Sequence, residues 1–439
     1  MLGLDFTIII FGALLTMIII GIPVVISLGL CSFFGLYFIT GNINTPLSLL
    51  QNTAYGAIRD YVFAVIPLFV LMGEFISKSG AAKDLYNLIH KSLRKLPGRL
   101  TLATVFGNAF FGAVTGVSIA SAAAFTRIAY PQMCDLKYNK TVSLGCIAGS
   151  ASLGMLIPPS VLLIVWGYIS EQSIGKLFIA GIIPGMLLAL LYALFIFFYS
   201  KVRPDYFGEN LTKELILDKI TKDEKIGSLA VLFLISIVLG GIWLGFFTPT
   251  EAAGIGALFA FILAIYKKVT FKEILEAILE TGKVSAPILL ILICAQMYSR
   301  LLAIGGITVG MQEIFSIFGD NKFLILLFMI FVWIVLGMFI DSISIILLTL
   351  PLFGPIAGQL LGTDPIAFAL IGIIVIEAGL LTPPLGLCVF TVKACVSDPE
   401  ATLGKIFKGA IPYWLLLLLL ASLIIIFPEI ATWLPKKMS

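Results

Sequence analysis

The chain is poor in charge and contains a single histidine, His90. Only 12% of its 439 residues are charged, whereas a soluble domain carries about 25%. The sequence has no HExxH, no GxGD-type pair of aspartates and no Ser/His arrangement, so an intramembrane hydrolase using Asp341 with Glu377 is a disfavoured alternative. No GxxxxGK[ST] motif occurs, which argues against an ATP-driven pump or exporter.

Neither the cysteines nor the start of the chain shows a recognisable functional motif. The six cysteines show no CxxC or Cys/His spacing, which favours small buried residues over a metal or redox site. No basic region precedes the first apolar run, so we expect no cleavable signal. The net charge of +4 is expected to reflect cytoplasmic loops and implies no nucleic-acid partner.

The sequence is rich in long apolar runs. Hydrophobic residues make up 60% of the chain, and many uncharged stretches approach the roughly 20 residues that a helix needs to cross a bilayer. The run Phe6–Phe38 is long enough for two crossings, with a break at Gly21 and Pro23. The sequence therefore predicts an all-α polytopic protein of the bacterial inner membrane.

The distribution of Lys and Arg predicts the topology. All but six of the 28 can be placed on one face, which the positive-inside rule makes cytoplasmic. The six on the other face are Arg59, Lys176, Arg300, Lys322, Lys436 and Lys437. This assignment puts both termini in the periplasm. It requires Leu100–Pro131 and Phe323–Pro355 to be re-entrant hairpins, the first from the cytoplasm and the second from the periplasm.

Prolines and glycines at matching positions in the two halves predict an internal repeat. Pro158-Pro159 and Pro383-Pro384 are 225 positions apart, as are Gly112 and Gly337, and Pro23/Pro249 and Pro184/Pro412 have nearly the same offset. Because the charge pattern places the two hairpins on opposite faces, the repeats are expected to be inverted. Inverted repeats with broken helices are typical of secondary transporters.

These patterns divide the chain into two repeats and a linker. We expect repeat one at 1–200, with scaffold helices at 5–77, an arm at 80–97, a hairpin at 100–131, a broken helix at 141–172 and a helix at 177–200. A cytoplasmic linker is expected at 201–225. Repeat two is expected at 226–439, with scaffold helices at 226–303, an arm at 304–322, a hairpin at 323–357, a broken helix at 365–396 and a helix at 409–428.

The double prolines and the hairpin tips are the candidate sites. Each double proline frees backbone carbonyls, which suit a hard cation such as Na⁺, beside Ser160 or Thr382, although a lone membrane proline is usually only a kink. At each tip a new helix begins, and its positive end can face an anion.

Single residues at the tips have more than one possible role. For Thr115, Ser118 and Ser121, helix packing by small residues is an open alternative. Asp341, at the second tip, is expected to be a cation ligand or proton site, whereas Glu377 either tunes the second break or braces it.

Four segments carry a resemblance to a known family. They are Phe247–Ala253 (FTPTEAA), Gly154–Ser160 (GMLIPPS), Lys176–Gly185 (KLFIAGIIPG) and Gly379–Gly386 (GLLTPPLG). Together they resemble the large membrane subunit of tripartite ATP-independent periplasmic (TRAP) transporters, the DctM family.

The resemblance implies an elevator transporter, in which hairpins and broken helices slide against a scaffold. It implies a small four-helix membrane subunit and a periplasmic substrate-binding protein as partners, and sodium-coupled uptake of a small organic anion, without enzyme activity. The residues expected to bind Na⁺ are Thr115, Ser118, Gly154, Pro158, Gly337, Asp341, Thr382 and Pro383. The residues expected to contact substrate are Ser118, Ser121, Ser160 and Ser342.

Two positions depart from the family pattern. The first tip reads Thr115-Gly-Val-Ser118, where Ser-Gly-Ser is common, and Cys388 stands where Asn is common. A stand-alone Na⁺- or H⁺-coupled carboxylate carrier of similar fold is the alternative function.

Overall fold

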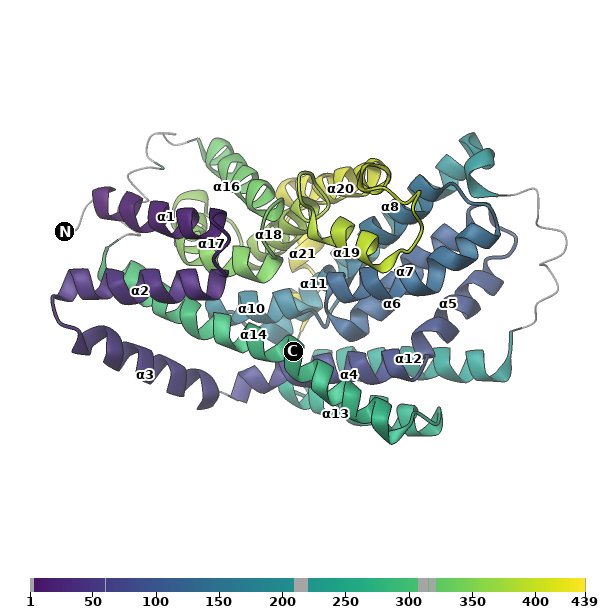
Figure 1. The fold of residues 1–439 in the computed structure, drawn as a ribbon, viewed down its shortest axis with the longest axis horizontal. Coiled ribbons are helices and arrows are strands. Elements are labelled where there is room, and N and C mark those ends of the chain that lie inside the picture. Colours follow the sequence, from purple (N-terminus) through teal and green to yellow (C-terminus); the bar gives the residue numbers. More distant parts are fainter. Residues whose placement is uncertain (1–3, 60, 209–219, 307–314, 316–320, 439) are drawn as a thin grey trace.

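The computed structural model describes residues 4–59, 61–208, 220–306, 315 and 321–438 (Figure 1). Every regular element in these ranges is helical, so the all-α prediction is confirmed. Within the same ranges seven helices are long and apolar enough to cross a membrane, or up to eight if the bent pair Lys140–Leu156 and Val161–Ile169 forms one span.

Among the described residues of the first half, five α-helices and the 3-10 turn η1 (Tyr61–Ala64) precede the hairpin. The α-helices are α1 (Leu4–Ile19), α2 (Val24–Thr40), α3 (Asn44–Arg59), α4 (Val65–Lys78) and α5 (Ala81–Ser92). The hairpin is α6 (Arg99–Thr115) and α7 (Ser118–Asp135), and α8 (Lys140–Ser150), α9 (Leu153–Leu156), α10 (Val161–Ile169) and α11 (Ile174–Val202) follow it.

The second half follows a similar order. Its first helices are α12 (Lys222–Trp243), α13 (Pro249–Tyr266) and α14 (Phe271–Ile304), and its hairpin is α16 (Lys322–Gly337) with α17 (Ser342–Ile356). A π-helical turn η5 (Ala357–Leu361), α18 (Pro365–Gly379), α19 (Leu387–Cys395), α20 (Leu403–Ile426) and the short α21 (Glu429–Thr432) complete it. Most of the arm expected at 304–322 lies outside the described residues, and the inversion of the two repeats stays a prediction.

Local sequence sets where three of the long helices begin. Thr221, Thr248 and Thr270 are the N-caps of α12, α13 and α14. Each threonine accepts from the backbone N–H of a glutamate three residues later, whose side chain bonds back to the threonine N–H. These reciprocal pairs satisfy backbone donors that a helix start otherwise leaves free.

The predicted scaffold helices pack on one another. Helix α4 lies against α13 and α14, and α14 also lies against α2. The packing of α4 on α13 is close, because a Cβ added to Gly256 of α13 would lie 2.5 Å from Sδ of Met72 on α4. In Figure 1 this group lies along the lower side of the molecule.

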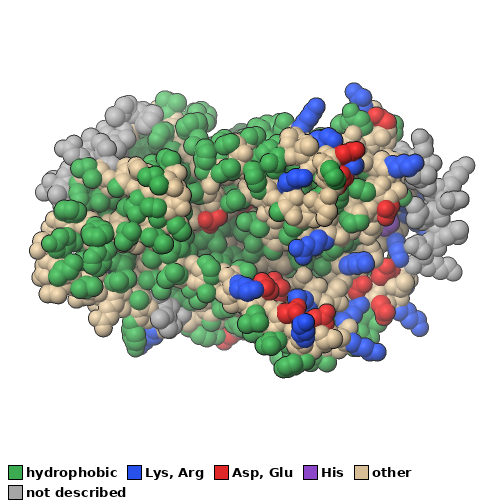
Figure 2. Space-filling view, in the orientation of Figure 1, with side chains coloured by type: hydrophobic (Ala, Val, Ile, Leu, Met, Phe, Trp, Pro, Cys, Tyr) green, Lys and Arg blue, Asp and Glu red, His purple; other side chains and the backbone are tan. Residues whose placement is uncertain are grey.

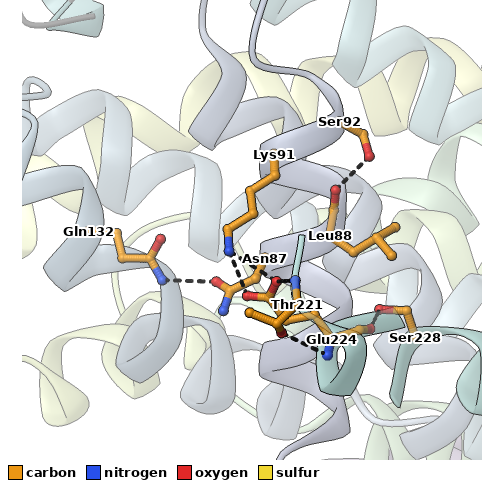
Figure 3. A network of polar contacts seen from close by, with 8 residues as sticks. All are labelled: Asn87, Leu88, Lys91, Ser92, Gln132, Thr221, Glu224 and Ser228. Carbon is orange, nitrogen blue, oxygen red and sulfur yellow. Dashed lines mark hydrogen bonds and ion pairs between the residues drawn. The ribbon is translucent and has the colours of Figure 1, made fainter. Parts of the chain in front are cut away.

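Helix α5 lies within the range expected for an arm and is held by polar contacts (Figure 3). Lys91 Nζ contacts both oxygens of Glu224 on α12, at 2.9 and 3.0 Å. Gln132 of the first hairpin donates to Asn87 of α5 at 3.5 Å. The arm therefore connects the first hairpin to the scaffold.

The two hairpins lie on opposite sides of the helices that separate them. Helices α6 and α7 lie on the right in Figure 1 and α16 and α17 on the left, with α10, α18 and α19 between them. On the face drawn in Figure 2, Lys and Arg side chains gather on the right, while the left is mostly hydrophobic. The charged end is therefore the one that holds the first hairpin.

Gly112 gives a test of this packing. A Cβ at Gly112 would lie 2.3 Å from the Cα of Gly154, and backbone atoms cannot move aside as a side chain can. We expect Gly112→Val to destabilise the protein by roughly 1–3 kcal/mol, as overpacking does. Thermal unfolding in detergent should show a lower midpoint. Gly254→Val in α13 is the matched control, because no described atom lies within 4 Å of a Cβ there. Equal midpoints for both variants would contradict the tight contact.

Candidate functional site

The first hairpin tip is hydrogen-bonded to the first broken helix. The carbonyl of Gly116, between α6 and α7, accepts from the backbone N–H of Val161, the first residue of α10, at 3.1 Å. One turn before the tip, Gly112 packs on Gly154, and Pro158 lies in the break between α9 and α10. We call residues 112–118 and 154–161 the first centre.

The second hairpin repeats this arrangement. The carbonyl of Met338 accepts from the backbone N–H of Gly386, the N-cap of α19, at 3.3 Å. Gly337 packs on Gly379, with a Cβ-to-Cα distance of 2.8 Å. Pro383 lies in the break between α18 and α19. We call residues 337–342 and 379–386 the second centre, and each centre contains half of the residues expected to bind sodium.

Three of the serines expected to contact substrate lie within or beside the first centre, and two of them, Ser160 and Ser121, differ in their hydrogen bonds. Ser160 donates to the carbonyl of Met155 at 2.5 Å and accepts from Leu163 N–H at 3.5 Å, so its hydroxyl bridges the helix break. Ser121 is fully buried, 3.0 Å from a Cβ built on Gly154, and its hydroxyl has no hydrogen-bond partner among the described residues. Ser121 is therefore the free hydroxyl of the pair.

The two threonines expected to bind sodium hydrogen-bond within their own helices. Thr115 donates to the carbonyl of Phe111 at 3.1 Å, and Thr382 donates to that of Ala378 at 2.8 Å. The methyl group of Thr115 lies 3.0 Å from a Cβ built on Gly73 of the scaffold helix α4. Both hydroxyl protons are occupied, but each oxygen keeps lone pairs for a cation.

Asp341 has a structural role in addition to the expected one. It is the N-cap of α17, where one carboxylate oxygen accepts from Ser344 N–H at 3.0 Å and the other accepts from Ser344 Oγ at 2.5 Å. A carboxylate has about four lone-pair positions, so these two bonds still leave capacity for a cation.

A buried carboxyl group joins the two centres. Glu377 of α18 is 1% exposed, and its Oε1 accepts from Ser342 Oγ at 2.9 Å. Ser118 of the first tip lies beside the same carboxyl group, and Cys388 Sγ lies 3.8 Å from Ser118 Oγ. Neither Glu377 nor Cys388 was among the residues expected to bind sodium or substrate, although Glu377 was expected to tune or brace the second break. An ionisable residue within a membrane helix was the signal for Glu377.

The two centres differ in exposure. In the first, Thr115 is 7% exposed and Ser118 is fully buried. In the second, Phe339 at the tip is 52% exposed and Leu385 in the break is 42% exposed. The first centre is therefore closed in this conformation, while the second reaches the surface.

A cavity of about 540 Å³ lies away from both centres. It is bounded by the ends of α10, α14 and α17 and the start of α18, and its walls include Trp166, Gln172, Ser299 and Phe368. None of the residues expected to bind sodium or substrate lines it. Its contact with the scaffold helix α14 places it between the second hairpin and the scaffold.

A polar contact joins the two halves near the ends of α7 and α8. Asp398, in the loop between α19 and α20, contacts Lys140 at 2.6 Å and accepts from the Tyr130 hydroxyl at 2.8 Å. The Lys140 ammonium lowers the pKa of Asp398 to about 2, with help from Glu400 N–H and Tyr130. The loop is thus attached to the base of the first hairpin.

The fold and the paired tips define a class: a polytopic membrane protein built like known transporters. The YdaH transporter of Alcanivorax borkumensis has a similar fold, with a TM-score of 0.59 at 16% identity over 88% of this chain and 90% of that one. The family model of the tripartite ATP-independent periplasmic transporter DctM component matches residues 11–430. The chain belongs to this family.

Two relatives illustrate the likeness. The C4-dicarboxylate TRAP transporter large permease protein DctM of Pseudomonas aeruginosa is 32% identical over 384 residues, which cover 86% of this chain and 87% of that protein. The sialic acid TRAP transporter large permease protein SiaM of Vibrio cholerae is 29% identical over 422 residues, 95% of each chain. The resemblance read from the sequence is therefore confirmed at the level of the family.

The two roles of Asp341 can be separated by substitution. Asp341→Asn keeps an N-cap acceptor, so thermal stability should change little, whereas Asp341→Ala should cost about 1 kcal/mol. If the carboxylate also binds sodium, both variants should need a higher sodium concentration for half-maximal uptake. Unfolding in detergent and sodium-activation curves measure the two effects. Unchanged sodium activation in Asp341→Asn would remove Asp341 from the ion site.

Proposed function

We propose that this chain is the large membrane subunit of a sodium-coupled uptake transporter for a small organic anion, and that it is not an enzyme. The observation that carries the proposal is the pair of equivalent centres, in which a hairpin tip is hydrogen-bonded to a broken helix at Gly116–Val161 and at Met338–Gly386. Broken helices with free backbone groups are where secondary transporters bind ions and substrates.

Sodium is the coupling ion that the donor atoms favour. Hard cations prefer oxygen ligands, and the two centres offer backbone carbonyls, hydroxyls and the carboxylate of Asp341. Among the described residues no group of three or more His, Cys, Asp or Glu side chains could hold a metal ion. A weakly charged, carbonyl-rich site of this kind suits a monovalent cation.

The start of α7 is our candidate position for the solute anion. The N-cap of α7 is Val117, and no side chain caps this helix, whereas α17 is capped by Asp341. Free N–H groups and the helix dipole favour negative charge at a helix start. Ser118 and Ser121 lie on the first turn and supply further donors. Relatives are named for C4-dicarboxylates and sialic acid, which are organic acids.

Transport is proposed to occur by an elevator movement, with two partner proteins. The hairpins and broken helices would slide against the scaffold formed by α2, α4, α13 and α14. This chain matches only 64% of the length of the isethionate TRAP transporter permease protein DctMQ, which leaves length in that protein for a further segment. A separate small membrane subunit would supply that segment here, and a periplasmic binding protein would deliver the solute.

Reconstituted transport tests the proposal. We expect solute uptake into proteoliposomes to require an inward sodium gradient, the small membrane subunit and the periplasmic binding protein, because the ion and the delivered solute bind together. Radiolabelled uptake would be measured with each component omitted in turn, and with potassium replacing sodium. Uptake by this chain alone would favour the stand-alone carrier, and uptake driven only by a proton gradient would exclude sodium coupling.

Reporter fusions test the proposed orientation in the inner membrane. Alkaline phosphatase fused after Ser439 should be active and green fluorescent protein at the same point should be dark, because the Lys and Arg distribution predicts a periplasmic C-terminus. Insertions between residues 209 and 219 are the matched control and should give the opposite result. Fluorescence at the C-terminus would reverse the assignment.

A further inference from the structure

One carboxyl group lies beside the hairpins of both halves. We infer that Glu377 is a positioning residue that holds the two hairpin tips together and thereby makes cation binding at the first and second centres cooperative. The inference rests on the proposed function, because it concerns how the two ion sites communicate. It goes beyond that function in assigning the communication to one side chain.

The contacts of Glu377 reach the first residue of each second hairpin helix. Ser342 begins α17 and donates to Glu377 Oε1 at 2.9 Å. Ser118 begins α7 and lies beside the same carboxyl group. Helix α7 belongs to the first half of the chain and α17 to the second. The carboxyl group of Glu377 therefore bridges the two hairpins.

The surroundings of Glu377 favour keeping both tips beside it. None of the ion pairs among the described residues includes Glu377. Its polar neighbours are instead the hydroxyls of Ser342 and Ser118. Because a buried carboxyl group without hydrogen-bond partners is costly, Glu377 favours conformations in which both serines remain beside it.

The same arrangement transmits order from one centre to the other. Glu377 Oε2 has no hydrogen-bond partner among the described residues, so the carboxylate already has fewer donors than it can accept. Withdrawing the second tip would remove the Ser342 donor, and withdrawing the first would remove the Ser118 hydroxyl that lies beside the carboxyl group. Cation binding that orders one tip thus keeps Glu377 in place for the other, and a shared contact of this kind is a source of coupling between sites.

Cys388 supplies a native reporter of this contact. Its Sγ lies 3.8 Å from Ser118 Oγ, and the residue is 1% exposed. If the tips separate, a thiol reagent should reach Cys388. The remaining cysteines can be replaced by serine so that only this thiol reacts; they are Cys31, Cys134, Cys146, Cys294 and Cys395.

The first experiment measures the rate at which a small methanethiosulfonate reagent modifies Cys388. Glu377→Gln keeps the side-chain volume and a carbonyl acceptor but removes the second acceptor oxygen. We expect modification to accelerate on the order of tenfold, the factor that follows from weakening one buried hydrogen bond. Glu377→Asp should fall between Gln and the parent. Glu74→Gln, a carboxyl change in α4 of the scaffold, is the matched control and should leave the rate unchanged.

The second experiment measures uptake against sodium concentration. The parent protein should give a sigmoidal curve, and Glu377→Gln should lower the Hill coefficient towards one, because the two centres would then fill independently. Ser342→Ala should shift the curve in the same direction without altering the carboxyl group, which keeps the test usable if Glu377→Gln folds poorly. A merely structural Glu377 would lower the amount of folded protein but leave the Hill coefficient unchanged.

The two experiments separate this inference from the proposed function. Absence of sodium-dependent uptake in the parent protein would refute the proposed function, whereas the modification rate of Cys388 would still test the contact. Equal modification rates in the parent and in Glu377→Gln would overturn the inference. So would an unchanged Hill coefficient in a well-folded Glu377→Gln variant.

Discussion

The structure depends on one constraint: backbone N–H and C=O groups inside a bilayer must find partners within the protein. Lipid offers no hydrogen bonds, so an interrupted helix at that depth is tolerated only where other protein groups surround it. This chain interrupts its helices near Pro158 and Pro383 and brings a hairpin tip to each interruption. The bonds Gly116–Val161 and Met338–Gly386 satisfy one group on each side and attach the tips to the breaks.

Glycine makes this mutual satisfaction geometrically possible. Gly112 faces Gly154 and Gly337 faces Gly379, and in both pairs a Cβ would lie less than 3 Å from the backbone opposite. The hairpin backbone can therefore approach the broken helix closely. The same glycine contact occurs in both halves, while the two centres differ in exposure and the inverted repeat stays a prediction.

Several features could be predicted because they depend on local sequence. Proline cannot continue a helix, so Pro158-Pro159 and Pro383-Pro384 marked the breaks, and the apolar runs with weak middles marked the hairpins. The role of Asp341 as an N-cap could have been suspected from its place before Ser342, but the prediction considered only its charge. The assignment of sodium ligands remains a prediction, since the donor atoms present permit it without requiring it.

The sequence by itself determined that this protein lies in a membrane, where its helices form and where they break. Apolar runs, proline and glycine have these effects within a local stretch of the chain. Only the tertiary structure decided which side chains meet at the breaks. Ser118, Ser342 and Cys388 are far apart in the chain, and their convergence on Glu377 follows from how two hairpins pack against α18 and α19. Contacts of that kind depend on the relative placement of whole helices, which no local pattern in the sequence records.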